Sequence, residues 1–242
     1  MENLKEKTVG LIAAGDYRTC AVFEKYGIDY FNQGKILLGE IAVNGNITLD
    51  NLINELNQVK EGNIDQDVDF NNWSLDVLAN YIIKTYHQPA EKEIPVIKQE
   101  LDTLTQDQPN GSPDWTEIKT LFDKVAGEIV VHQKKEELIL FPYIRKMADA
   151  KNNQKPFVRP PMTKSAENPV NMLTHEHQDQ GETFKKIASL CREYKLPETV
   201  SKEHQEIIQH LKDFDEKLHL HIHLENNILF PKALQLDKEL AG

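Results

Sequence analysis

The hydrophobic and polar positions divide the chain into a short first part and a longer second part. Up to about residue 62, short stretches with helical apolar periodicity alternate with glycines. One predicted helix runs near 18–26 and is followed by Gly27, the residue type that most often follows a helix C-terminus. A second predicted helix begins near residue 48. Its apolar face consists of Leu49, Leu52, Ile53 and Leu56.

From residue 73 onward the apolar periodicity becomes longer. It predicts four helices, over about 74–102, 113–150, 168–194 and from 201 past 230. Ser74 can cap the first, and Ser112 followed by Pro113 marks the start of the second. Pro89 and Pro95 are expected to kink or shorten the first helix. The third is expected to be broken at Leu196-Pro197.

Short connections between four long helices indicate an all-α protein built on an antiparallel four-helix bundle. One such connection is the predicted loop over 151–161. The polar segment 61–72 separates the bundle from the first part and is expected to be a linker. We therefore expect two domains, a small helical domain over 1–62 and a bundle over 70–242.

The composition of the chain argues against several classes of function. Lys and Arg number 28 against 39 Asp and Glu, which gives a net charge of -11 and argues against nucleic-acid binding. No apolar run approaches the roughly 20 residues that span a bilayer, and the N-terminus lacks the apolar core of a secretory signal. The two cysteines, Cys20 and Cys191, indicate neither a disulfide framework nor a zinc site. We expect a cytoplasmic protein that binds no membrane.

Histidine is unevenly distributed and belongs to an internal repeat. None of the nine histidines precedes His87. The segments 132–142 and 221–231, offset by 89 residues, share the pattern His-x3-Glu-x2-Ile-Leu-Phe-Pro. His87 lies 45 residues before His132, and His177 lies 44 before His221. The chain thus repeats a helix with one histidine followed by a helix with His-x3-Glu. The Ile-Leu-Phe-Pro tail is expected to pack in the core and kink the helix.

The repeat assembles a set of metal ligands. Residues four apart share a helix face, so His132 can act with Glu136, and His221 with Glu225. The predicted ligands are His87, His132, Glu136, His177, His221 and Glu225. Six ligands exceed the four of zinc and suit two metals, each held by two imidazoles and sharing two bridging carboxylates. Nitrogen and oxygen ligands without thiolate favour iron or manganese, with positions left for an oxo or hydroxo bridge and one small molecule.

The other histidines are expected on the surface or behind the ligands. They are His175, His204, His210, His219 and His223. His219 and His223 form a rival pair, but they point away from His221, because two residues turn a helix by about 200°. Glu128 and Glu176 lie close to the ligands. They could relay protons or line a metal entry path, although an ordinary solvated role is the preferred interpretation.

These motifs resemble those of a known family. The repeated His-x3-Glu-x2-Ile-Leu-Phe-Pro, with Thr85-Tyr86-His87 and Glu176-His177, resembles the hemerythrin-like di-iron domain of iron–sulfur cluster repair proteins. Residues 21–30 are similar to the short N-terminal domain of that family. The resemblance covers nearly the whole chain. It implies a hemerythrin-like bundle, two non-haem irons per chain, a cytoplasmic homodimer, and a role in restoring iron–sulfur clusters after nitric oxide or oxidative damage.

One short segment departs from the family pattern. The family places Cys-Cys-Gly-Gly after Gly-Ile-Asp-aromatic, whereas this chain has Phe31, Asn32, Gln33 and Gly34 there. Cys20 lies eleven residues before Phe31 and is no substitute. We therefore expect the first 62 residues to be a docking or dimer-forming element without redox chemistry. Since all six predicted ligands lie from His87 onward, we also expect a metal site that does not depend on this element.

Three functions are compatible with this ligand set. The first is a stress-response protein that repairs iron–sulfur clusters, by donating iron to damaged client proteins, or processes nitric oxide. The second is a reversible carrier or sensor of O2 or NO without turnover. The third is an enzyme that uses O2 for oxidation. The same ligands serve all three, so the alternatives stay open at the level of sequence, as does the question of whether the protein is an enzyme.

Overall fold

The computed structural model describes residues 4–41, 48–61, 69–105, 113–160, 165–195 and 201–241. These residues are helical or irregular, and their only β-type pairing is an isolated antiparallel bridge between Thr8 and Leu37. The all-α fold predicted from the sequence is therefore confirmed. No helix of the described part is both long and apolar enough to cross a membrane.

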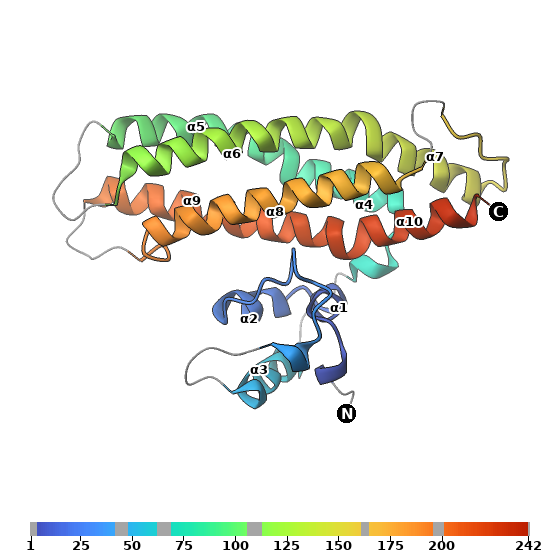
Figure 1. The fold of residues 1–242 in the computed structure, drawn as a ribbon, viewed down its shortest axis with the longest axis horizontal. Helices are drawn as coiled ribbons and strands as arrows, with labels where there is room; N and C mark the ends of the chain where they lie inside the picture. The colour runs from blue at the N-terminus through green and yellow to red at the C-terminus, as the bar shows by residue number, and fades with distance from the viewer. Residues whose placement is uncertain are drawn as a thin grey trace.

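Four long helical rods form an antiparallel bundle (Figure 1). The first is α4 (Leu75–Ile82), η4 (Ile83–His87) and α5 (Gln88–Leu104). The second is α6 (Trp115–Lys135), η5 (Glu136–Leu140) and α7 (Phe141–Asn152). The third is α8 (Glu167–Leu190), and the fourth is α9 (Lys202–Leu224), η6 (Glu225–Leu229) and α10 (Phe230–Glu239). Helices α5 and α8 each pack against both α6 and α9, so each helix of the bundle has two neighbours and faces a third across the core.

Two helix ends differ from those predicted. Helix α6 begins at Trp115, because the side chain of Asp114 caps it by accepting a hydrogen bond from the Glu117 amide at 3.0 Å. Pro113 therefore precedes the helix, and Ser112 lies outside the described residues. Helix α8 ends at Leu190 rather than near residue 194, because residues 192–194 have positive φ angles. The predicted break at 196–197 lies outside the described residues.

A π-helical turn precedes a proline in three of the rods. The turns are η4, η5 and η6, and the prolines are Pro89, Pro142 and Pro231. A proline inside an α-helix lacks an N–H, and its ring clashes with the carbonyl four residues earlier. A π turn, in which bonds span five residues, relieves that clash. The first rod therefore passes Pro89. It also contains Pro95, within α5, and continues to Leu104, so of the predicted kink or shortening the shortening is absent.

The N-terminal helices lie together beside the fourth rod (Figure 1). They are η1 (Leu4–Glu6), α1 (Val9–Gly15), α2 (Thr19–Lys25), η2 (Leu38–Glu40) and α3 (Leu49–Glu61), with η3 (Phe70–Asn72) leading to the bundle. Gly27 has a φ of 64° and follows α2 as predicted. Phe23 and Tyr30 belong to the same cluster of buried side chains as Leu218 and Ile222 of α9. The two parts of the chain therefore share one core.

Candidate metal centre

The structure brings all six predicted ligands together inside the bundle. His87 ends η4, Glu136 and Glu225 begin η5 and η6, and the other three lie on α6, α8 and α9. None is more than 3% exposed. One group of potential ligands consists of His87, Glu136, His221 and Glu225, and the other of His132, Glu136, His177 and Glu225. Within each group the ligand atoms lie within 4.8 Å of one another. Both glutamates belong to both groups.

Each glutamate turns one carboxylate oxygen toward each group. Glu136 Oε2 lies 3.5 Å from His87 Nε2, and Glu136 Oε1 lies 3.4 Å from His132 Nε2. Glu225 Oε1 lies 3.1 Å from His221 Nε2, and Glu225 Oε2 lies 3.2 Å from His177 Nε2. Ligand atoms bound at about 2.1 Å and at right angles lie about 3 Å apart. These separations therefore fit two cations with the carboxylates between them.

Hydrogen-bond acceptors behind three of the four histidine rings fix the position of the ring proton. A carboxylate can only accept a hydrogen bond, so an imidazole that faces one carries its proton on the nitrogen it presents. The donor nitrogens and their acceptors are His87 Nδ1 and Glu137 Oε1 at 3.0 Å, His132 Nδ1 and Glu176 Oε2 at 2.9 Å, and His177 Nδ1 and Asn226 Oδ1 at 2.9 Å. When these rings are neutral, as metal ligands are, their Nε2 lone pairs therefore point into the site.

The chemistry of this donor set fits a pair of metal ions. His87 Nε2 lies 3.1 Å from His221 Nε2, and His132 Nε2 lies 2.9 Å from His177 Nε2. Two facing lone pairs repel unless a cation or a proton lies between them. In addition, the four carboxylate oxygens of Glu136 and Glu225 are buried and accept no hydrogen bond from the described residues. Buried carboxylate oxygens without hydrogen bonds are costly, and two cations would remove both problems.

The two carboxylates have different proton affinities. Burial, and then the charge of Glu225, raises the pKa of Glu136 to about 7. Burial acts in the same direction on Glu225, but His221 and His177 outweigh it and hold the pKa of that carboxyl well below its usual range. Burial also lowers the pKa of His87 to about 4, which favours the neutral ring. Binding of cations at this site would displace the protons that remain.

Two outer partners were not found from the sequence. Glu137 and Asn226 occupy the same place in the repeat, directly after the shared glutamates. Successive residues of an α-helix lie about 100° apart, so periodicity gave no reason to place them near a ligand. Their equivalent position in the two repeats was the available signal. Glu176, for which a solvated role was preferred, instead accepts from His132, whereas Glu128 is exposed and pairs with Lys124 at 3.8 Å.

None of the other five histidines belongs to either group. His175 and His210 lie on the surface as predicted. His219 lies between Asp215 and Glu24, at 3.1 and 2.9 Å. His223 is hydrogen-bonded to Asn227 at 2.9 Å.

The prediction was wrong for His204. This side chain is buried in the core beside Trp115, where it contacts Ser201, so it lies neither on the surface nor behind a ligand. The prediction was also wrong for His223, which is only 1% exposed and is hydrogen-bonded to Asn227 rather than to a predicted ligand.

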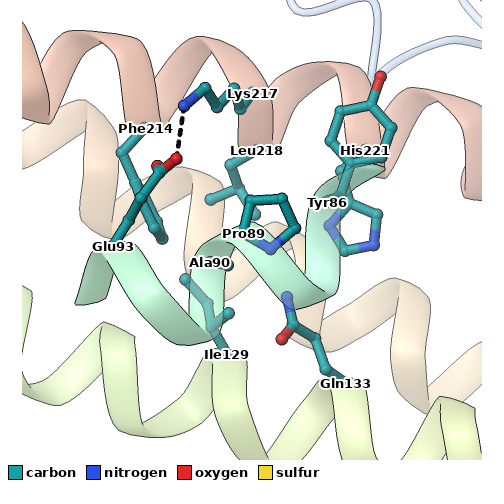
Figure 2. Close-up of a pocket in the computed structure, with 10 residues that line it drawn as sticks. All are labelled: Tyr86, Pro89, Ala90, Glu93, Ile129, Gln133, Phe214, Lys217, Leu218 and His221. Carbon is teal, nitrogen blue, oxygen red and sulfur yellow. Dashed lines mark hydrogen bonds and ion pairs between the residues drawn. The ribbon is translucent and has the colours of Figure 1, made fainter. Parts of the chain in front are cut away.

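A small cavity of about 20 Å³ reaches His221 from between α5, α6 and α9. Figure 2 shows His221 and Tyr86 at one end of its lining and the ion pair of Lys217 and Glu93 at the other. The wall between them is mainly apolar, and it consists of Pro89, Ala90, Ile129, Phe214 and Leu218, with Gln133. A volume of this size holds about one water molecule or one diatomic molecule.

Comparisons with known proteins agree with this geometry. Residues 78–233 match the family described as Hemerythrin HHE cation binding domain, and residues 5–60 match a Domain of Unknown function (DUF542). An iron–sulfur cluster repair protein YtfE of Dickeya chrysanthemi is 26% identical over 234 residues, which cover 96% of this chain and 98% of that protein. A YtfE protein of Salmonella typhimurium is 26% identical over 95% of this chain and 97% of its own length. The chain belongs to the hemerythrin HHE cation-binding family and carries a DUF542 domain before it.

Proposed function

We propose that this protein holds two non-haem irons and acts in the response to nitrosative or oxidative stress, by repairing iron–sulfur clusters or by processing nitric oxide. One observation carries the proposal: two buried groups of two histidines and two glutamates share Glu136 and Glu225, so that two cations can be held side by side. The names of the near full-length relatives support the repair role. We further propose a cytoplasmic homodimer whose clients are damaged iron–sulfur proteins.

The residues of the chain divide the work at this centre. His87 and His221 would hold one iron and His132 and His177 the other, with the two glutamates bridging. When bound, an iron pair supplies one-electron oxidation-state changes and open positions for NO or O2. Glu137, Glu176 and Asn226 hold protons on the outer Nδ1 atoms and thereby keep the Nε2 atoms free. The buried surroundings exclude bulk water.

A reversible carrier or sensor of NO or O2 is the second candidate. The cavity beside His221 favours it, because about 20 Å³ is room for about one diatomic molecule. The side chains of Phe31 and Asn32 favour it too, because they supply no thiol at the position where the family carries its cysteine pair.

Iron analysis tests the proposal directly. Protein purified from iron-supplemented cells is expected to contain about two irons per chain, because six ligands form two complete groups. One metal per chain, or zinc alone, would contradict the di-iron assignment. The reduced protein is then mixed with NO. Catalytic consumption of NO supports processing, and stoichiometric binding supports a carrier or sensor. In a separate experiment the protein is mixed with a damaged iron–sulfur protein, and restored activity of that protein supports repair.

Filling the cavity tests its use by a small ligand. Ala90→Leu places a larger apolar side chain in the cavity wall and is expected to slow NO binding in stopped-flow measurements, while iron content stays at about two per chain. Leu218→Ala, which removes side-chain volume from the same wall, serves as the opposite change. Binding rates that do not differ between the two variants would show that the ligand enters elsewhere.

A further inference from the structure

Asn226 joins a proposed metal ligand to the N-terminal domain. Its Oδ1 lies 2.9 Å from His177 Nδ1, while its Nδ2 donates to the carbonyl of Phe31 at 3.2 Å. Phe31 belongs to the docking loop, which we define as residues Tyr30–Gly34. We propose that Asn226 is a positioning residue, through which the docking loop holds His177 in its ligating form and so supports one of the two metal sites. This inference rests on the di-iron centre proposed above.

The orientation of the Asn226 amide decides which nitrogen of His177 carries the proton. An amide presents an acceptor oxygen at one end and a donor nitrogen at the other. If the Asn226 side chain were flipped, its nitrogen would donate to His177 Nδ1. The imidazole would then carry its proton on Nε2, which could no longer bind a metal. Two neighbours favour the orientation that keeps His177 competent. The Phe31 carbonyl, at 3.2 Å, accepts only from the nitrogen end, and the Thr174 hydroxyl donates to the oxygen end at a longer 3.5 Å, so the shorter contact is the one to the docking loop.

The docking loop is fitted closely to the bundle around this contact. Asn32 Nδ2 donates to the carbonyl of His177 at 3.4 Å. A Cβ atom added at Gly181, one turn after His177 on α8, would lie 2.7 Å from Asn32 Nδ2. The neighbouring Asn227 donates to the carbonyl of Tyr30 at 3.0 Å. The loop is therefore positioned from both α8 and η6.

The support is specific to one of the two sites. Glu137 occupies the equivalent place in the other repeat, but it is a carboxylate and needs no selection between two ends. Lys134, three residues earlier on the same rod, donates a hydrogen bond to the second carboxylate oxygen of Glu137 at 2.8 Å. The outer partner of His87 is thus fixed within the bundle. Loss of docking should loosen the site of His132 and His177 and leave that of His87 and His221 intact.

The contact between Asn226 and the Phe31 carbonyl revises the expectation that the metal site does not depend on the N-terminal domain. The ligands do all lie from His87 onward, as the sequence indicated. The outer partner of His177, however, takes its orientation from the carbonyl of Phe31. Because a backbone carbonyl acts here, the missing cysteine pair does not prevent it.

The test uses Gly181→Ala in the full chain, with Gly127→Ala as its control. Both glycines lie inside long helices, but a Cβ at Gly127 meets nothing within 4 Å, whereas one at Gly181 meets the docking loop. The added Cβ pushes against the Asn32 and Phe31 side chains but leaves Asn226 in place, so we expect Gly181→Ala to weaken one of two irons by less than the roughly 10–100-fold that follows loss of an outer partner. A chelator should then remove iron in two phases, and the Mössbauer signal of one iron should fall. Gly127→Ala should behave as the wild type.

A rescue variant separates positioning from general damage. Asn226→Leu removes the acceptor and should weaken the same iron. Asn226→Asp supplies a carboxylate, as Glu137 does in the first repeat, and should retain both irons. In the Asn226→Asp background, Gly181→Ala should no longer affect iron binding, because either carboxylate oxygen can accept from His177.

The possible outcomes distinguish this inference from the proposed function. Two firmly bound irons in both Gly181→Ala and Asn226→Leu would overturn the inference and leave the di-iron centre standing. Equal loss of both irons, or no rescue by Asn226→Asp, would also overturn it. A wild-type protein that binds no iron pair would instead contradict the proposed function.

Discussion

Glu225→Gln is expected to weaken the binding of both irons at once. The carboxylate turns Oε1 toward His221 at 3.1 Å and Oε2 toward His177 at 3.2 Å, so both proposed sites share it. Glutamine has the same size, but it offers one oxygen and one N–H2 group and carries no charge. We expect the iron affinity to fall by more than the roughly 10–100-fold that follows removal of an outer partner. Competition with a chelator measures it.

Glu216→Gln provides the matched control for this variant. Glu216 lies on the fourth rod and pairs with Lys212 on the surface, at 3.5 Å. The Glu216→Gln variant should keep about two irons per chain. Glu136→Gln should behave as Glu225→Gln does, because Glu136 also belongs to both groups. If either variant lost one iron and kept the other at wild-type affinity, that carboxylate would belong to a single site.

His221→Ala is expected to empty one site and spare the other. His221 Nε2 lies 3.1 Å from His87 Nε2 and 3.1 Å from Glu225 Oε1, deep in the bundle, and this histidine belongs only to the group of His87. Iron content should fall from about two to about one per chain. Metal analysis with Mössbauer spectroscopy of the remaining iron checks this result.

Two histidines of the same helix serve as controls. His210→Ala, which removes an exposed ring paired with Glu100, should retain both irons. His219→Ala removes a ring that faces Glu24 of the N-terminal domain. It should keep the iron between His87 and His221, even if docking is weakened. Equal loss of that iron in the His219→Ala and His221→Ala variants would mean that the repeat had been aligned in the wrong frame.

The fold and the clustering of the six predicted ligands could be predicted because both depend on periodicity. Apolar residues at helical spacing mark the four rods, and a residue and its fourth successor share a face. The repeat added the choice of His221 over His219 and His223. The structure places those two side chains against Glu24 and Asn227, away from the site.

The outer partners could not be predicted because they depend on contacts between helices. Glu137 belongs to the second rod but serves His87 of the first, and Asn226 of the fourth rod serves His177 of the third. Helical spacing orders side chains along one helix and says nothing about which neighbour they reach. The π turns were missed for a related reason. A proline predicts a disturbed helix, but it does not indicate whether the helix ends, bends or widens.

The carboxylate oxygens of Glu136 and Glu225, which accept no hydrogen bond from the described residues, bear on how long the protein survives in a cell. Each buried polar atom without a hydrogen bond costs about 1–3 kcal/mol of folding free energy. The metal-free chain therefore folds at a disadvantage that bound cations remove, and a ligand present at 100 times its Kd adds about 2.7 kcal/mol to the folded state. The rate at which proteases cleave transiently opened chains depends on the fraction of chains that are open, and therefore on this free-energy difference. The abundance of the protein would then track the iron supply even at a constant rate of synthesis.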